Sequence, residues 1–293
     1  MKKLLLYIFP IAFLWMISSC EKDISVDLPR PESKVVVDGY VEAGLPPYIL
    51  LSRNAGYFDP IDTAALNNNS ETGAVIIISD GITTETMTEI DTVIDGNVVK
   101  GIYTALGMIG TPGRTYTIDI TTLKGEKLSS STKLDLPVSL DSTWFKIQDG
   151  KDSLGFVWAN LDDPDSLNNC YRWFAKRIGK DDFFIAPFGS TFEDKFINGK
   201  KFDFAYNRGM IANSDAEDDN NDEAGFFKKG DTIVVKFCSV DRSTFEFWRD
   251  AENQIGNNGS PFAVPSNIKS NIKGGLGLFA SYTATYDTVY APL

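Results

Sequence analysis

The sequence predicts an all-β protein, in which a β-sandwich is followed by a second β-rich domain with one substantial helix. Two observations lead to this prediction. Short runs rich in β-branched and aromatic residues recur along the chain, with Gly, Pro, Asn and Asp between them about every 8–12 residues. Helical periodicity is clear in one stretch, which begins at Ser243. We place the two domains at residues 34–136 and 137–293.

The first predicted domain contains seven candidate strands. They cover residues 34–41, 48–52, 74–79, 83–94, 101–104, 114–120 and 127–134. Residues 114–120 alternate between apolar and polar side chains, as a half-buried strand requires, and Asp80-Gly81 is a strong turn dipeptide. Many short strands with regular turn signals are typical of an immunoglobulin/transthyretin-like β-sandwich, which is the fold that we predict here.

The second predicted domain begins after Asp135-Leu136-Pro137 and is richer in aromatic residues. Runs of β-branched and aromatic residues again indicate strands, because such side chains fit a pleated, half-buried surface. The candidate strands contain Trp144 with Phe145, Phe156 with Trp158, Tyr171 with Trp173 and Phe174, residues 231–240, and the end of the chain up to Tyr290. We therefore expect the second domain to be mainly β as well.

The single predicted helix runs from Ser243 to about Ile255. Ser243 and Glu246 have the spacing of a capping box, in which each side chain bonds a free backbone N–H of the first turn. Phe245, Trp248 and Ile255 approximate one apolar face. Ser243 is therefore the predicted N-cap of this helix.

The first residues resemble a secretory signal that ends at a cysteine. Lys2 and Lys3 follow Met1, an apolar run extends from Leu4 to Ile17, and Ser18-Ser19 precedes Cys20. The run is shorter than the ~20 residues that cross a bilayer, and its end resembles a lipobox, although Ile17 fits the usual Leu position less well. We predict a signal peptide at residues 1–19 and lipidation of Cys20. The alternative is a buried or anchoring helix with an incidental cysteine.

A polar segment joins the predicted lipid to the first strand. Residues 20–33 include Pro29 and Pro31 and predict a tether. Lipid chains on Cys20 would hold the mature chain on a membrane, at about 0.8 kcal/mol per buried CH₂. Glu21-Lys22-Asp23 is similar to a short surface-export signal of lipoproteins, and the alternative is an ordinary solvated tether.

Charge and residue usage exclude several classes of function. The formal net charge of -12 opposes nucleic-acid binding, which needs basic surfaces, so we expect no nucleic-acid partner. The chain has no histidine, which excludes Ser-His-Asp and Cys-His catalysis and zinc sites that need imidazole. Cys170 and Cys238 are too few for a four-thiolate zinc site, and their separation neither supports nor forbids a disulfide. We predict no catalytic residue and no cofactor.

An acidic tract provides weak candidates for metal ligands. The side chains with oxygen atoms that Ca²⁺ would prefer are Asp215, Glu217, Asp219, Asn221, Asp222 and Glu223. An EF-hand loop counted from Asp215 needs Gly sixth and Glu twelfth, where the chain has Asn220 and Phe226. The alternative is a solvated loop. The tract lies within a connection at residues 205–230, where we expect a ligand or receptor to bind, because long connections on β scaffolds often carry binding sites.

Three further patterns have structural explanations. Asp162, Asp163 and Asp165 around Pro164 could supply carboxylates for glycoside hydrolysis, but these residue types also favour a β-turn, which we predict. The glycine-rich residues 274–277 lack the Lys-Ser/Thr of a phosphate loop and predict close backbone packing. Aromatic side chains of the second domain could stack on sugars, although we expect most of them in the core.

Several segments carry a resemblance to a known family. They are VVVDGYVEAG at 35–44, LLSR at 50–53, AVIIISDG at 74–81, GRTYTIDI at 113–120, DLPVSLDS at 135–142, GDTIVVKFCSVD at 230–241, FEFW at 245–248 and PFAVPSNIKSNIKGGLGLFASY at 261–282. The last segment is the most specific, and together they extend over nearly the whole mature chain. On these segments the sequence resembles DUF4249, a family of uncharacterised Bacteroidota lipoproteins. Cys170 stands where the resemblance leads us to expect an aromatic residue.

The resemblance implies a role without any catalytic residue. The family has no established activity, and its members are commonly encoded beside TonB-dependent receptors. The resemblance therefore implies a non-enzymatic accessory or binding lipoprotein of a nutrient-uptake system, anchored in the outer membrane and facing the cell surface. Its partners would be the membrane, a TonB-dependent β-barrel receptor and an unknown small ligand. Two alternatives stay open: a surface glycan hydrolase that uses carboxylates, and a structural or adhesive protein.

Overall fold

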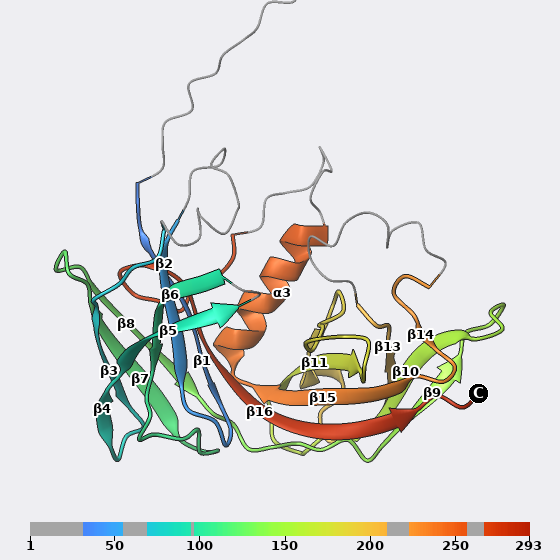
Figure 1. Cartoon of the computed structure of the whole chain (residues 1–293). Helices are drawn as coiled ribbons and strands as arrows, with labels where there is room; N and C mark the ends of the chain where they lie inside the picture. Colours follow the sequence, from blue (N-terminus) through green and yellow to red (C-terminus); the bar gives the residue numbers. More distant parts are fainter. Residues whose placement is uncertain (1–31, 55–68, 95–96, 210–222, 257–266) are drawn as a thin grey trace, which may run out of the picture. The chain divides into compact units, whose positions relative to one another are not determined.

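Strands dominate the protein, as the sequence predicts. The computed structural model describes residues 32–54, 69–94, 97–209, 223–256 and 267–293 (Figure 1). The chain divides into the units Met1–Glu32 and Ser33–Leu293, and all elements described below belong to the second unit. Strands make up 51% of the structure and helix 8%. The prediction of an all-β, sandwich-like fold with a single substantial helix is confirmed.

The described residues form sixteen strands, one α-helix and a 3-10 turn. The strands before residue 136 are β1 (Val35–Glu42), β2 (Tyr48–Arg53), β3 (Val75–Ser79), β4 (Thr84–Thr86), β5 (Thr88–Ile94), β6 (Asn97–Thr104), β7 (Thr115–Thr121) and β8 (Lys127–Lys133). The later elements are β9 (Ser142–Ile147), β10 (Leu154–Asp162), β11 (Cys170–Arg177), β12 (Thr191–Glu193), η2 (Asp194–Phe196), β13 (Lys201–Tyr206), β14 (Phe227–Lys228), β15 (Thr232–Val240), α3 (Arg242–Gly256) and β16 (Leu276–Tyr290).

An eight-stranded sheet, called the central sheet below, runs through the whole unit. Its strand order is β12-β11-β15-β16-β1-β2-β6-β5. β16 joins its two halves: it pairs in parallel with β1, with Val37 opposite Gly277, and antiparallel with β15, with Phe237 opposite Thr285. The central sheet therefore contains strands from both sides of residue 136. The division into two domains at that residue stays a prediction.

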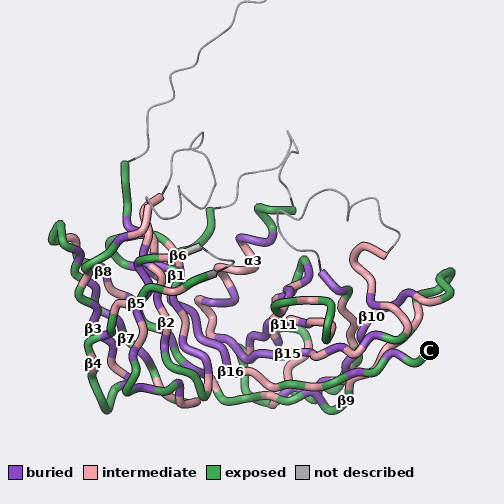
Figure 2. Tube along the Cα trace, viewed as in Figure 1, coloured by how far each residue is buried: buried purple, intermediate pink, exposed green. Residues whose placement is uncertain are grey.

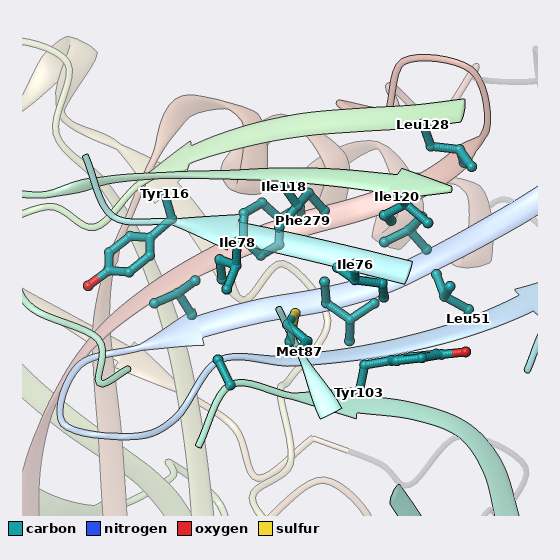
Figure 3. Packing of buried hydrophobic residues seen from close by; sticks show 14 of the residues in the cluster. Leu51, Ile76, Ile78, Met87, Tyr103, Tyr116, Ile118, Ile120, Leu128 and Phe279 are labelled. Atoms are coloured by element: carbon teal, nitrogen blue, oxygen red, sulfur yellow. The ribbon is translucent and has the colours of Figure 1, made fainter. Parts of the chain in front are cut away.

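Two smaller sheets share hydrophobic cores with one face of the central sheet. The sheet β4-β3-β7-β8 packs Ile76 and Ile118 into a first core with Val37 and Phe279 of the central sheet (Figure 3). The sheet β13-β10-β14, with β9 paired to β10, belongs to a second core that also contains Trp173. Side chains alternate between the two faces along a strand, so every second residue of the central strands enters these cores. Figure 2 shows buried positions along β1, and in β16 residues 278–283 are all buried because both faces of the sheet are covered there.

The opposite face of the central sheet carries α3. Leu278, Ala280 and Tyr282 alternate with Phe279 along β16 and form a third cluster with Phe245 of α3. Figure 1 shows α3 next to the middle of the central sheet. A helix that packs here covers part of an apolar surface that would otherwise face water. This face, between α3 and the exposed ends of the strands, holds the cavity described below.

The predicted helix exists, but its predicted cap is wrong. α3 begins at Arg242, and the Asp241 carboxylate accepts a hydrogen bond from the backbone N–H of Thr244 at 2.9 Å. The hydroxyl of Ser243 donates to Asp241 instead of capping the helix itself. A carboxylate suits this place because it also interacts favourably with the positive end of the helix dipole. Ile255 is 68% exposed, so it does not belong to the buried face of the helix as expected.

Three short strands have no counterpart in the sequence-based expectation. β12, β14 and β13 contain 3, 2 and 6 residues, and β13 overlaps the start of the segment that we expect to be a long connection. β12 and β14 offer too few positions for an alternating pattern to appear, whereas Phe202, Phe204 and Tyr206 do alternate with polar or small residues in β13. The expected strand at 83–94 is interrupted at Met87, which separates β4 from β5 and is buried in the first core. The two strands then pair in different sheets.

Glycine at position 277 is required by the close approach of β16 to β1, as the sequence predicts for this glycine-rich segment. Gly277 has φ of +107°, and a Cβ built on it would lie 2.0 Å from the carbonyl oxygen of Val37. We expect Gly277→Ala to lower the free energy of unfolding by about 2–4 kcal/mol, because strained backbone and a forced shift of the paired strand both contribute. Urea denaturation monitored by circular dichroism measures this loss.

Gly125→Ala is the matched control for this prediction. Gly125 also has a positive φ of +81°, but a Cβ there meets nothing within 4 Å. We therefore expect a loss of only about 1 kcal/mol, from the backbone conformation alone. Equal losses in the two variants would show that contact with Val37 does not constrain residue 277.

Candidate functional site

The site residues predicted near the N-terminus and in the acidic tract lie mostly outside the described residues. This holds for Cys20, Glu21, Lys22, Asp23, Asp215, Glu217, Asp219, Asn221 and Asp222. Glu223 is described and forms an ion pair with Lys228. Within the described ranges, no group of three or more His, Cys, Asp or Glu residues could hold a metal ion. Across the same residues, no helix is long and apolar enough to span a membrane.

The acidic residues at 162–165 lie where β10 ends: Asp162 is the last residue of the strand, Asp163 and Asp165 follow in the connection to β11, and the turn itself lies at residues 167 and 168 rather than at the predicted place. Asp163 is buried and accepts hydrogen bonds from the Tyr171 hydroxyl and, at 3.2 Å, from the backbone N–H of Gly199. Burial raises the pKa of Asp163 above its usual value. Its carboxylate therefore holds β11 and the segment before β13 together, and Asp162 is exposed to solvent. The two carboxylates are not placed to act together on one bond.

Most aromatic residues of the second half are core residues, as expected. Tyr171, Trp173 and Phe237 are fully buried in the second core. Trp144 and Trp158 stack on each other outside that core, with ring centroids 6.2 Å apart. The Lys146 ammonium lies 4.9 Å from the ring centroid of Trp158. Cys170 and Cys238 are buried free thiols.

A cavity of about 420 Å³, called the sheet-face cavity below, lies on the face of the central sheet that carries α3. Asp38, Tyr40 and Glu42 line it from β1, because alternate residues of a strand point to the same face. Ala280 and Tyr282 are register partners of Tyr40 and Glu42 on β16 and line the cavity beside them. β1 and β16 therefore provide one continuous wall of the cavity.

The second wall comes from β11, β15 and α3. Arg172 and Phe174 belong to β11, Lys236 to β15 and Trp248 to α3. Phe184 completes this wall from the segment after β11. That segment is fixed to the edge of β11, because Ala175 and Ile185 exchange backbone hydrogen bonds of 3.0 and 2.9 Å. The cavity thus joins residues that are more than two hundred positions apart in the chain.

The guanidinium group of Arg172 lies between two aromatic rings in this wall. Its Cζ atom is 3.6 Å from the centroid of the Trp248 ring and 4.7 Å from that of Phe174. Nε donates to the Ser190 hydroxyl at 3.2 Å, and Nη1 donates to the Tyr282 hydroxyl at 3.2 Å. Cation–π contacts of this kind are strongest where water is excluded. Arg172 is therefore held rigidly at the base of the cavity.

Glu252 of α3 neutralises Arg172. The two charged groups are 3.7 Å apart, and their side chains are 10% and 6% exposed. The Glu252 carboxylate also accepts a hydrogen bond of 2.9 Å from the backbone N–H of Ser190. The indole N–H of Trp248, one turn earlier on α3, donates to the Tyr282 hydroxyl at 2.8 Å. This network attaches α3 to the central sheet and sets the position of Trp248.

Lys236 is paired as well. Its ammonium donates to the Glu42 carboxylate at 2.7 Å, and the Tyr286 hydroxyl donates to the same carboxylate at 3.1 Å. Burial and the nearby charge of Glu42 raise the pKa of Tyr286, so its hydroxyl stays protonated at neutral pH. The ammonium also lies 5.7 Å from the Phe174 ring centroid. Both cations that line the cavity therefore have a carboxylate partner.

Asp38 differs from the other charged residues of the cavity. Among the described residues it has no hydrogen-bond or ion-pair partner, and desolvation is the one cause that raises its pKa. The residue as a whole is exposed and lines the cavity, while neighbouring groups desolvate its carboxylate in part. The two neighbouring positions on the same face of the sheet are Leu278 and Leu50, which are apolar. Asp38 is thus an uncompensated negative charge in largely apolar surroundings.

A second cavity, of about 990 Å³, lies between residues 133–138, the turn at 164–169 and the start of α3. Cys170 lines it, but burial raises the pKa of this thiol to about 12. At neutral pH the thiol is therefore protonated and unsuited to act as a nucleophile. Asp241, also in the lining, is already used as the cap of α3. Cys170 and Asp241 therefore have structural roles in this cavity.

The sheet-face cavity has the size and the lining of a small-molecule site. Its volume lies within the roughly 300–1,000 Å³ of small-molecule sites, and it combines apolar rings with a few fixed polar groups. Among the described residues, Asp38 and Glu42 are the carboxylates that line it, and their Cα positions are about 13 Å apart along an extended strand.

Sequence reasoning did not identify these residues, although part of the signal is visible. Asp38, Tyr40 and Glu42 alternate with Val37, Gly39 and Val41 in a predicted strand, so one of its faces is polar and aromatic. Arg172 stands between Tyr171 and Trp173, where a charged residue in an apolar run indicates a buried partner. Of the connection at 205–230, where we expect binding, the described residues 205–209 and 223–230 do not line the cavity.

Comparison with solved structures finds distant similarities. One of the similar structures is the crystal structure of a mutant alpha-2-macroglobulin from Salmonella, with a TM-score of 0.23 and 8% sequence identity. The likeness covers 94% of this chain and 16% of that one, so this chain spans a small part of the larger protein. No curated protein matches the sequence.

Comparison with protein families gives a clear match. Residues 21–288 match the family described as "Domain of unknown function (DUF4249)". The match includes every residue of the sheet-face cavity named above and starts directly after Cys20. It also agrees with the resemblance carried by the sequence segments. The chain belongs to the DUF4249 family.

Proposed function

We propose that the protein is a lipoprotein of a Bacteroidota outer membrane that faces the cell surface and binds a small ligand. In this proposal lipid on Cys20 anchors it, Glu21-Lys22-Asp23 directs its export, and a TonB-dependent β-barrel receptor is its partner. The protein acts as a non-enzymatic accessory of nutrient uptake. The observation that carries the proposal is the sheet-face cavity, which brings aromatic rings and a free carboxylate together.

Two further features support this proposal. The lipobox-like end of the apolar run predicts that the chain is attached at its N-terminus through lipid, and a polar tether follows it. Arg172 and Lys236 of the cavity are held by neutralising pairs, which is an arrangement that fixes a binding surface in advance. Pre-organised sites lose less conformational entropy when a ligand binds. A surface-exposed binding protein beside a transporter would use such a site to collect its ligand.

The test of this proposal is affinity purification of the native lipoprotein from detergent-solubilised membranes of its own cells. We expect a TonB-dependent β-barrel receptor to co-purify in stoichiometric amounts. A Cys20→Ala chain, which is exported but not lipidated, is the control for attachment to the same membrane. Recovery of the lipidated protein without any β-barrel receptor would contradict the accessory role and favour the structural or adhesive alternative.

A further inference from the structure

We propose that the sheet-face cavity selects an organic cation, namely a primary ammonium group carried on a small apolar or aromatic body, and that Asp38 binds the ammonium. This inference rests on the proposed role in small-ligand binding and names the class of ligand. It depends on three features of the cavity: which charged side chains already have a partner, which aromatic rings have no cation over them, and which apolar residues lie beside Asp38 and Tyr40.

The first step concerns charge. Arg172 is paired with Glu252 at 3.7 Å, and Lys236 with Glu42 at 2.7 Å. All three nitrogens of the Arg172 guanidinium have partners, so an anionic ligand would have to break existing contacts to reach this cation. Asp38 has no such partner among the described residues. A partly desolvated carboxylate without a partner is stabilised by an opposite charge, which a cationic ligand would supply.

The second step concerns the aromatic rings. The faces of Phe174 and Trp248 are already taken by Arg172. Tyr40, two residues from Asp38 on the same face of β1, packs against Tyr48 and Tyr282 with centroid distances of 5.4 and 6.3 Å and has no cation over its ring among the contacts of the described residues. An electron-rich ring beside a carboxylate is a favourable site for an ammonium group.

The third step concerns the apolar part of the ligand. Leu278 is the register partner of Asp38, and Ala280 is the register partner of Tyr40, so both lie directly beside the two proposed binding residues. Both are lining residues of the cavity. Small and aliphatic side chains at these positions leave room for, and bury, an apolar body next to the ammonium. The net charge of the chain, -12, also favours the approach of a cation over that of an anion.

Isothermal titration calorimetry tests the inference with three probes of similar shape: phenethylammonium chloride, the neutral phenethyl alcohol and the anionic hydrocinnamate. The protein is the chain without signal peptide and lipid, which keeps the whole compact unit Ser33–Leu293 and its cores. At neutral pH and low salt we expect the ammonium to bind at least about tenfold more tightly than either analogue. Only the ammonium can form an ion pair with Asp38 and a cation–π contact with Tyr40.

The decisive variant is Asp38→Asn, with Asp287→Asn as its matched control. Asp287 carries the same charge on the same sheet, but it alternates with Tyr286 and so lies on the opposite face from the cavity. We expect Asp38→Asn to weaken binding of the ammonium about tenfold, and Asp287→Asn to leave it unchanged. Circular dichroism confirms that both variants keep the fold.

Three results would overturn the inference: no saturable binding of the ammonium up to its solubility limit, equal affinity for the neutral or anionic analogue, or equal effects of the two substitutions. Its failure can be separated from failure of the proposed function. Tight binding of the neutral or anionic probe would remove the ammonium class but keep a small-ligand site. Absence of a co-purifying receptor would remove the accessory role and leave the ligand class unaffected.

Discussion

Arg172→Ala is expected to lower the free energy of unfolding by about 3–5 kcal/mol, because it leaves the buried carboxylate of Glu252 without a counter-charge. The same change removes the donors to Ser190 and Tyr282 and the cation between the rings of Phe174 and Trp248. α3 would then lose its ion pair with the central sheet, while the hydrogen bond of Trp248 to Tyr282 stays. Urea denaturation followed by tryptophan fluorescence measures the loss.

Arg242→Ala is the matched control, because it removes an arginine from an exposed ion pair instead of a buried one. Arg242 also pairs with a glutamate, Glu193, but the two side chains are 39% and 30% exposed. Exposed pairs contribute about 0–1 kcal/mol, so this variant should be nearly as stable as the natural protein. A double variant, Arg172→Met with Glu252→Leu, should recover much of the lost stability, since no buried charge stays uncompensated. Equal losses for Arg172→Ala and Arg242→Ala would refute the role assigned to the buried network.

Cys20→Ala is expected to move nearly all of the protein from the membrane fraction to the soluble fraction. The reason is that lipid on this cysteine is the predicted attachment, at about 0.8 kcal/mol per buried CH₂, and several acyl chains together hold a protein stably. Metabolic labelling with palmitate, followed by membrane fractionation, measures both consequences. The labelled band should disappear in the variant.

Cys170→Ala is the control for this second prediction. Cys170 is a buried free thiol, so its replacement should change neither labelling nor fractionation. Persistent labelling of the Cys20→Ala chain, or its continued recovery with membranes, would mean that the lipobox prediction is wrong. The alternative of an anchoring N-terminal helix would then be favoured.

The long strands and the helix were predictable from the sequence because their signals are local. β1, β7 and β15 show runs or alternation of apolar residues over seven to nine positions. β12 and β14 have three and two residues, which is too short for a period to appear. The cap of α3 was missed because Ser243 and Asp241 both suit an N-cap, and only the backbone hydrogen bond to Asp241 distinguishes them.

The site was less predictable because it depends on pairing between distant strands. The polar face of β1, with Asp38 and Glu42, is visible in the sequence. Its place beside β16 depends on a parallel register, which sequence periodicity does not specify. The pairing of Lys236 with Glu42 joins residues 194 positions apart. The strand order of the central sheet decides which charged side chains find a partner. It therefore also decides that Asp38 has none among the described residues.

The most direct test of the central claim, that the sheet-face cavity is the binding site, is an NMR titration of the tryptophan indole N–H signals. A Trp248→Phe variant assigns the Trp248 signal, and the spectrum is followed while a mixture of small ammonium, neutral and anionic aromatic compounds is added. We expect the Trp248 signal to shift, because its indole N–H bonds Tyr282 in the cavity wall. The signals of Trp144, Trp158 and Trp173, which do not line the cavity, should stay in place. Movement of the Trp144 and Trp158 signals with an unchanged Trp248 signal would contradict the account.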